Sequence, residues 1–406
     1  MAIDNKEKEV LNVPHLRFPE FSGEWKKHSL GEIGETIIGL TYKPSDVVDN
    51  NGIIVFRSSN IKNGMIDYSD LVRVNKYIKD KIITKENDIL VCARNGSQRL
   101  IGKNAIIKQE DANNTFGAFM MVYRANDNPF ILPLLSTNKY FSQVGENLGA
   151  RINQITTSDF NGFEFYFPEN HAERTKIAEL FRLLDERIAT QNKIIEKLQS
   201  LIKGLNDNIH KGIKGETVCF SDLGEAYSGL SGKGGDDFGY GEPFITYMNV
   251  YQNTYISEKD YELVQIAPNE KQNSVQYGDA LFTLSSETPE EVGIGAVYLG
   301  NTQKLYLNSF CFGIHFYDER VLPQYLAHFI SSSSFRRAIY PLAQGSTRFN
   351  LQKNDFMKMK FLLPSLEKQG HIANTLDALH CRLANEKSLT EQYILLKKYL
   401  LSLMFI

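Results

Sequence analysis

The sequence has few cysteines, no long apolar run and no complete cofactor loop, and each absence narrows what the chain can do. Its 4 cysteines, spread over 406 residues, form no C-x-x-C pair, which argues against a zinc ribbon or a disulfide framework. No segment approaches the ~18 apolar residues of a membrane span, and the polar start of the chain carries no secretion signal. We therefore expect a soluble, cytoplasmic protein.

Segments that come near to catalytic motifs fail on their spacing. The stretch DNPF (127–130) has one proline where the loop of amino-methyltransferases has two, and no Gly-rich strand precedes it. The stretch GLSGKGG (229–235) lacks the Ser or Thr of a phosphate loop, and GIGAVYLG (293–300) lacks the third glycine of a dinucleotide loop. The 8 histidines form no H-x-x-x-H pair, so no metal site is predicted. These observations favour a binding protein without catalysis of its own.

Charge is nearly balanced, but the basic residues are unevenly placed. The formal net charge is −3, which neither requires nor excludes nucleic acid. Residues 91–109 carry four basic side chains and no acid, and residues 320–354 carry five basic side chains and again no acid. Each stretch predicts a local positive surface on a chain that is otherwise close to neutral.

The second half of the chain repeats the first with an offset near 195 residues. The matches include Leu30-Gly31-Glu32 with Leu223-Gly224-Glu225, Asp88 with Asp279, Gly102 with Gly295, Arg151 with Arg348, and Asn153 with Asn350. A period this long is not that of a solenoid, so it indicates a duplicated domain followed by a helix.

Each copy changes its periodicity behind a proline. The earlier part of each copy contains short apolar or alternating runs between Gly, Asn and Asp turns, which is typical of strands, with shorter helices expected near 131–145 and 322–338. The later part follows Pro168 or Pro364 and has helical spacing. The predicted fold is α+β, with an N-terminal segment (1–24), a first head (25–169), a central helix (170–212), a second head (213–364) and a distal helix (365–406).

The two helical segments carry a coiled-coil seam. Apolar residues follow a 4-3 spacing that predicts an antiparallel pair of helices within the chain, at Ile177, Phe181, Leu184, Ile188, Ile195, Leu198, Ile372, Leu376, Leu379 and Leu383. Beyond Leu383 the seam is predicted to resume one step out of phase, through Leu389, Tyr393, Leu396, Leu400 and Leu403. Asn170 with Glu173 predicts the start of the central helix, and Gly212 predicts its end.

Two interpretations of the polar seam positions stay open. Gln191 and Glu386 fall at the same seam position in the two copies, where a polar contact would set the register of the pair. Alternatively, Glu386 turns to water. A helix of about 40 residues is roughly 60 Å long, while one turn of duplex DNA spans about 34–36 Å. Such a helix is long enough to hold two heads over separate patches of one DNA duplex.

The residues around both helices resemble one known family. The N-terminal stretch NVPHLRFPEFSGEWKKHSLGEI (12–33) resembles the opening of type I restriction-modification specificity subunits. The segments PENHAERTKIAELFRLLDERI (168–188) and PSLEKQGHIANTLDALHCRL (364–383) resemble the central and distal helical regions of that family. The two copies differ at one place. In the second copy, Glu367 and Gln369 approximate the acidic residue and glutamine that are usual in the family, whereas the first copy has Ala172 and Arg174 there.

This resemblance implies a function and a set of partners. The heads would be two target recognition domains that each read half of a bipartite, asymmetric sequence in double-stranded DNA. The helices would set the gap between the halves and bind two methylation subunits, which restriction subunits join. S-adenosylmethionine, ATP and Mg would belong to those partner subunits, and this chain would hold no cofactor and no metal.

Side chains suited to DNA occur in comparable loops of both heads. Lys and Arg bind phosphates, while Arg, Asn, Gln, Ser and Thr read base edges. In the first head we predict DNA contacts from Arg57, Ser59, Asn60, Lys62, Arg94, Asn95, Gln98, Arg99, Arg151 and Asn153. In the second head we predict them from Lys233, Tyr247, Asn249, Tyr251, Ser285, Ser286, Arg348 and Asn350. A residue present in both heads is expected to grip phosphate or to brace the fold, because the two heads read different bases.

Two other functions remain to be separated from this one. A stand-alone adenine DNA methyltransferase would need a cofactor strand and a doubled-proline loop beside its recognition domain. A coiled-coil adaptor would bind protein through its heads, with little dependence on salt or DNA.

Overall fold

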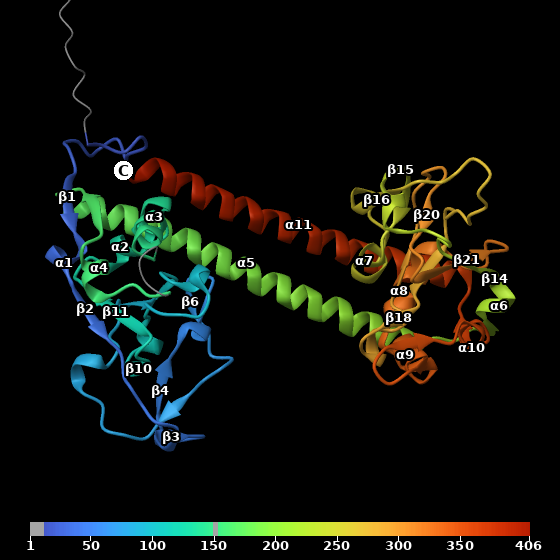
Figure 1. Ribbon diagram of the computed structural model, residues 1–406, viewed down its shortest axis with the longest axis horizontal. Helices are drawn as coiled ribbons and strands as arrows, with labels where there is room; N and C mark the ends of the chain where they lie inside the picture. The colour runs from blue at the N-terminus through green and yellow to red at the C-terminus, as the bar shows by residue number, and fades with distance from the viewer. Residues whose placement is uncertain (1–11, 149–152) are drawn as a thin grey trace, which may run out of the picture. The chain divides into compact units, whose positions relative to one another are not determined.

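The computed structural model describes residues 12–148 and 153–406 (Figure 1). These residues form two compact units, with Met1–Asn192 and Leu389–Ile406 in unit 1 and Lys193–Ser388 in unit 2. Each unit therefore contains one head together with part of each of the two long helices, and each is described by itself.

The first head is built on an antiparallel sheet of order β2-β11-β8-β9, with β2 (Glu35–Ile38), β11 (Met120–Arg124), β8 (Ile89–Cys92) and β9 (Asn104–Ile106). A second sheet of order β10-β4-β7-β3 contains β10 (Thr115–Phe116), β4 (Ile53–Phe56), β7 (Arg73–Val74) and β3 (Val47–Val48), with β10 parallel to β4. Two further antiparallel pairs are β1 (Lys26–Ser29) with β12 (Glu164–Phe167), and β5 (Ile61–Lys62) with β6 (Met65–Ile66). Its helices are α1 (Leu30–Ile33), α2 (Asn128–Leu134), α3 (Asn138–Leu148) and α4 (Thr157–Asn161).

The second head repeats this plan strand for strand in its main sheet, which has the order β14-β21-β17-β19, with β14 (Gly224–Ser228), β21 (Cys311–Phe316), β17 (Ala280–Thr283) and β19 (Gly295–Val297). The other strands are β13 (Glu216–Cys219) with β24 (Lys360–Leu363); β16 (Tyr261–Val264), β15 (Phe238–Ile245) and the parallel β20 (Tyr306–Leu307); and β18 (Ser285–Ser286), β23 (Phe349–Leu351) and β22 (Ala343–Gln344). Its helices are α6 (Phe220–Leu223), α7 (Tyr247–Gln252), α8 (Pro323–Ser331), α9 (Ser333–Ile339) and α10 (Lys353–Met357).

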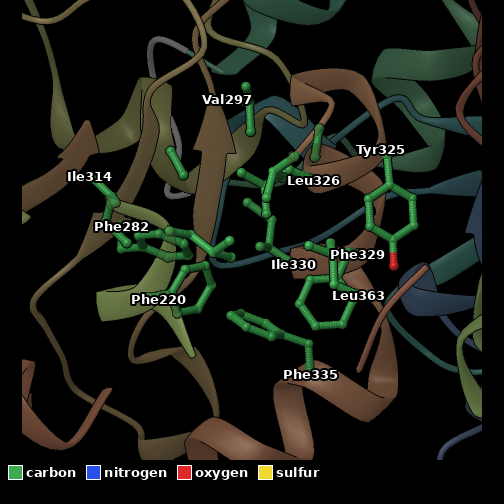
Figure 2. Packing of buried hydrophobic residues seen from close by; sticks show 14 of the residues in the cluster. Phe220, Phe282, Val297, Ile314, Tyr325, Leu326, Phe329, Ile330, Phe335 and Leu363 are labelled. Atoms are coloured by element: carbon green, nitrogen blue, oxygen red, sulfur yellow. The ribbon is translucent and has the colours of Figure 1, made fainter. Parts of the chain in front are cut away.

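The apolar run of β8 is continuous because both faces of its sheet are covered. Ile89 and Val91 pack into a cluster that includes helices α2 and α3, while Leu90 and Cys92 pack into a cluster that includes β4 and β10. Successive side chains of a strand point to opposite faces, so one buried strand serves two cores. In unit 2, β17 is divided in the same way, and Figure 2 shows the core on its helix-covered face, with Phe282 beside Phe220 and Phe335.

The topology confirms the duplication but corrects its register. Helix α1 corresponds to α6, and the glycine that ends each of them is Gly34 or Gly224, whose N–H donates to the carbonyl of Leu30 or Phe220. The sequence match of Leu30 with Leu223 is therefore wrong by three residues. A Cβ on Gly34 would stand 2.5 Å from the hydroxyl of Tyr123, which explains the glycine at this junction.

Three other sequence matches are tested by the strand pairing. Asp88 and Asp279 each precede the equivalent strands β8 and β17, so that match is confirmed. Gly102 corresponds to Gly293 and not to Gly295, because both precede the next strand with a positive φ, +80° and +67°. Arg94 pairs with Gln154 in the first head, and the equivalent Ser285 pairs with Asn350 in the second. Asn350 therefore corresponds to Gln154, and the match of Asn153 with Asn350 is wrong by one residue.

The helices predicted near 131–145 and 322–338 are present, each as a pair: α2 with α3, and α8 with α9. The central and distal helices are α5 (His171–Lys211) and α11 (Leu366–Met404). The predicted ends of α5 are confirmed, because the Asn170 side chain accepts from the N–H of Ala172 and the N–H of Gly212 donates to Asn208.

The two long helices pair antiparallel within each unit. In unit 1, Asp185 of α5 forms an ion pair with Lys397 of α11 at 2.5 Å, and Phe181 packs on Phe405 with ring centroids 5.7 Å apart. In unit 2, Leu205 and Ile209 pack on a core that contains Ile372, Ala373 and Leu376. Residue numbers fall along α11 as they rise along α5, as the predicted coiled coil requires. All ten predicted seam residues are buried or half-buried.

The predicted phase slip in the distal helix is wrong. The 4-3 spacing of covered positions continues through Glu386 and Thr390, which are 5% and 6% exposed, whereas Leu396 is 43% exposed. The interpretation in which Glu386 turns to water is therefore wrong, and within unit 2 this carboxylate is paired with Arg382. Gln191 is also buried, so polar side chains occupy covered places of the seam in both helices.

The starts of the two long helices are each held by one buried polar side chain. Glu173 is fully buried and accepts two hydrogen bonds of 2.7 Å from Arg17, together with one from the indole N–H of Trp25. Gln369 is fully buried as well: it accepts from the N–H of Leu322 and donates to the carbonyl of Arg320. Glu173 thus anchors the N-terminal segment rather than completing the helix cap.

Candidate nucleic-acid interface

Three of the predicted loops of the first head meet at one place. The Asn95 side chain, in the loop after β8, donates to the hydroxyl of Ser58 at 3.0 Å, in the loop after β4. The Asn153 side chain, in the loop before α4, donates to the carbonyl of Gly96 at 2.9 Å. Because these hydrogen bonds join segments distant in sequence, Asn95 and Asn153 brace the loops against one another. Arg151 lies outside the described residues.

The exposed side chains of this loop cluster are Ser59, Lys62, Arg94, Gln98 and Arg99. Of the two basic groups nearest β4, Arg57 forms an ion pair with Asp70 at 2.7 Å, and Lys62 forms one with Asp67 at 3.0 Å. The bond from Ser69, followed by that from Lys62, lowers the pKa of Asp67 to about 2, so this carboxylate is charged at neutral pH. Arg94, Gln98 and Arg99 present hydrogen-bond donors that suit phosphates or base edges.

Asn60 and Asn249 are equivalent residues and both are buried, at 0% and 2% exposure. Asn60 accepts from the N–H of Arg57 and donates to the carbonyls of Asp67 and Asp70. Asn249 accepts from the N–H of Ser257 and donates to its carbonyl. In this structure both amides are engaged within their own loops. The sequence signal was an Asn four residues after the last residue of β4 or β15, a position that recurs in both heads.

The second head presents a different surface, built around a carboxylate. Tyr251 and Ser286 both donate to Glu291, at 2.7 and 3.0 Å, and these hydrogen bonds lower the pKa of Glu291. Tyr247 stacks on Tyr251 with ring centroids 6.0 Å apart and donates to the carbonyl of Ser285. Glu291 was missed by the sequence reasoning, because an acid is an unlikely guess for DNA binding even though carboxylates accept from the cytosine amino group.

Two basic side chains of the second head, the predicted Lys233 and Arg336 of the basic stretch 320–354, are used inside the fold. The Lys233 side chain is 8% exposed, and its ammonium pairs with Glu270 at 2.6 Å, which lowers the pKa of Glu270 to about 2. Arg336 donates to the carbonyls of Glu290, Val292 and Gly293, so it braces a loop. The basic stretch of the second head therefore supplies less free charge than its composition predicts.

Each head also has an exposed phenylalanine beneath an arginine. The guanidinium of Arg94 lies 5.1 Å from the ring centre of Phe119, and that of Arg348 lies 5.4 Å from the ring centre of Phe310. Both rings are more than half exposed, at 58% and 53%. The sequence reasoning missed both, because each Phe begins an apolar run that reads as a strand.

The long helices carry exposed apolar side chains of their own. In unit 1, Leu395 and Tyr399 of α11 are 63% and 61% exposed, with Ile394 and Leu396 beside them. Exposed large apolar groups gathered on one helix often mark contacts with other proteins. In the part of the chain that the structure describes, no group of His, Cys, Asp and Glu has a metal-binding arrangement, and no helix is long and apolar enough to cross a bilayer.

Comparisons with known proteins agree on one family. A family model described as the type I restriction modification DNA specificity domain matches the chain twice, at residues 22–200 and 215–392. The type I restriction enzyme EcoKI specificity subunit of Escherichia coli (strain K12) is 24% identical over 387 residues, covering 87% of this chain and 82% of its own. The StySPI specificity subunit of Salmonella potsdam is 26% identical over 187 residues, or 44% of this chain and 40% of its own.

Two solved structures have the same fold. The S subunit of a type I restriction-modification system from M. genitalium matches with a TM-score of 0.54 and 13% identity, over 97% of this chain and 99% of its own. A chain from a study of complex assembly and conformational transition of the type I system matches with a TM-score of 0.55 and 15% identity, over 93% and 96%.

Proposed function

This chain belongs to the family of type I restriction-modification DNA specificity subunits, and from that premise we propose that its two heads read unlike halves of one bipartite, asymmetric DNA site. The observation that carries the proposal is that the two heads share one topology but expose different side chains. Between β8 and β9 the first head exposes Gln98 and Arg99, whereas between β17 and β19 the second head has Glu291, which accepts a hydrogen bond from Tyr251.

Within each head we assign the predicted residues to two tasks. The exposed side chains are the candidate DNA contacts: Ser59, Lys62, Arg94, Gln98 and Arg99 in the first head, and Arg348 and Asn350 in the second, where the half-buried rings of Tyr247 and Tyr251 are further candidates. The buried or engaged side chains hold the loops in shape: Arg57, Asn60, Asn95 and Asn153, and Lys233, Asn249, Ser285 and Ser286. This division rests on burial and on hydrogen bonds, because a buried amide with its bonds made has nothing to offer a base.

The long helices serve as the spacer between half-sites and as the binding surface for two methylation subunits, which restriction subunits join. Support comes from the exposed Leu395 and Tyr399 of α11, since aromatic and apolar anchors dominate protein interfaces. In this proposal the chain is not itself catalytic and works in the cytoplasm. The partner subunits hold S-adenosylmethionine, ATP and Mg.

Family membership does not favour the other two functions. A stand-alone adenine methyltransferase would carry a catalytic domain beside its recognition domain, whereas the two family matches take up residues 22–200 and 215–392. An adaptor whose heads bind protein would show neither DNA affinity nor salt dependence.

Methylation mapping tests the proposal. Genomic DNA from cells that carry this chain with its methylation subunit should show methylated adenines within one discontinuous motif. Exchange of residues 25–169 for the head of another family member should change one half of the motif and leave the other half intact. The control is the same cell with an inactive methylation subunit. A continuous motif, or one that survives exchange of either head, would count against the proposal.

A further inference from the structure

The paired Arg94–Phe119 and Arg348–Phe310 contacts occupy equivalent places in the two heads. Phe119 immediately precedes β11, and Phe310 immediately precedes β21. The next residue pairs with the last residue of the neighbouring strand in both cases, Met120 with Cys92 and Cys311 with Thr283. The two phenylalanines are therefore counterparts in the duplicated fold.

Equivalent backbone hydrogen bonds hold the main chain of both phenylalanines. The carbonyl of Phe119 accepts from the N–H groups of Ala93 and Arg94, each at 3.0 Å, and the carbonyl of Phe310 accepts from the N–H of Leu284 at 2.8 Å. The main chain of each Phe is thereby tied to the loop that follows β8 or β17. An exposed Phe on a rigid support is a stable platform for a cation.

The two arginines reach their rings from different segments. Arg94 belongs to the loop after β8, whereas Arg348 belongs to the turn between β22 and β23. The counterpart of Arg94 by strand pairing is Ser285, which is 5% exposed and pairs with Asn350. Both heads thus place a guanidinium over equivalent phenylalanine rings, although the arginine comes from a different loop in each head.

We propose that Phe119 and Phe310 are positioning residues that hold Arg94 and Arg348 as a DNA-backbone grip common to both heads. A guanidinium whose face lies over a ring keeps its N–H edge free for the bidentate contact that phosphate accepts. A grip shared by heads with unlike reading surfaces suits phosphate, which is the same at every base pair. The inference rests on the proposed function and adds residues to it.

The test measures DNA binding by the full chain assembled with its methylation subunits. The probes are a labelled duplex that carries the motif found by methylation mapping and a second duplex of the same length without it. We expect Phe119→Leu to weaken binding to both duplexes about two- to fivefold, as the loss of an exposed cation–π contact allows. Arg94→Ala should weaken both duplexes and reduce the slope of log affinity against log salt by about 0.9.

A double-mutant cycle and a rescue separate positioning from direct contact. In an Arg94→Ala background, Phe119→Leu should have no further effect on binding. In the otherwise unchanged chain, Phe119→Tyr should bind DNA like the parent, because an aromatic ring remains beneath Arg94. Phe310 and Arg348 should behave alike in the second head. The control variant is Tyr317→Ala, an exposed aromatic residue at the other end of β21 from Phe310.

Three results would overturn the inference. They are an equal loss from Phe119→Leu with and without Arg94, a loss confined to the duplex that carries the motif, and no loss at all while the variant melts like the parent. If Phe119→Leu lowers the melting temperature, the Phe310→Leu cycle decides in its place. Failure of the parent complex to prefer its motif would instead refute the proposed function, whatever the variants do.

Discussion

Replacement of Asn60 by Ala should loosen one of the loops proposed to contact DNA without unfolding the first head. The Asn60 side chain makes three hydrogen bonds to main-chain groups of Arg57, Asp67 and Asp70, and it is fully buried. A buried polar group left without its partner costs about 1–3 kcal/mol. Asp70 lies at the surface, so water replaces part of the loss there, and we expect a cost of about 2 kcal/mol.

That cost should appear as local opening, measured by amide hydrogen exchange of the full chain. A change of about 2 kcal/mol raises the rate of exchange through local opening about 30-fold in peptides that cover residues 57–70. Peptides from β8 and β11 should exchange as in the parent, because these two strands pair with each other and their backbone hydrogen bonds do not involve residues 57–70. Affinity for the motif duplex should fall as well, since DNA must then order the loop that carries Ser59 and Lys62.

Two comparison variants sharpen this result. Asn60→Asp keeps the acceptor for the N–H of Arg57 but turns an oxygen toward two carbonyls, so it should open the loop more than Ala does. Asn50→Ala, an exposed Asn in the same head, should change nothing. Unchanged exchange over residues 57–70 in Asn60→Ala, or equal opening across β8 and β11, would refute this account of the loop.

Three further perturbations address other parts of the chain. Ile195→Asp, which puts a charge at a half-buried seam position, should cost about 2 kcal/mol or more and weaken capture of the methylation subunit in a pull-down, while circular dichroism shows both heads folded. Leu395→Asp or Tyr399→Asp should lower affinity for the methylation subunit tenfold or more by titration, with no change in melting temperature. Burial lowers the pKa values of His328 and His380 below their ordinary 6.5. Protonation therefore favours the unfolded state: their contribution to stability is present above about pH 6.5 and is lost as the pH falls. Peptides from α8 should accordingly exchange faster at pH 5.5 than at pH 7.5, after correction for the intrinsic rate.

Sequence periodicity predicted the long helices because it is a local property of the chain. The 4-3 spacing from Ile177 onward reports which face of α5 is covered, whatever covers it. The same rule failed at Glu386 and Thr390, since it counts apolar residues and a polar group in the seam looks like a break. The predicted slip to Leu396 followed from assuming that every seam position is apolar. The buried carboxylate of Glu386 shows that the 4-3 spacing continues through a polar residue.

Residue type marked loops as candidates for DNA contact but did not show which of their side chains are exposed. Asn60 and Arg94 both suit base reading by chemistry, yet one is buried within its loop and the other is exposed over Phe119. Burial depends on how the loop closes, which hydrogen bonds between distant residues decide and which a single sequence does not display. The predicted domain boundaries and the division of contacts between bases and phosphates remain predictions.

The duplicated fold explains how the two heads can diverge in reading while they stay alike in form. Asn60 and Asn249 close equivalent loops, and Phe119 and Phe310 hold equivalent places, so substitutions elsewhere in those loops leave the support intact. A mismatched base pair costs about 1–3 kcal/mol, and these costs add for well-separated positions. Linked heads make the second contact intramolecular, so two modest readers together discriminate strongly. A head can then acquire a new half-site by change at a few exposed residues, while the supporting residues in each loop stay as they are.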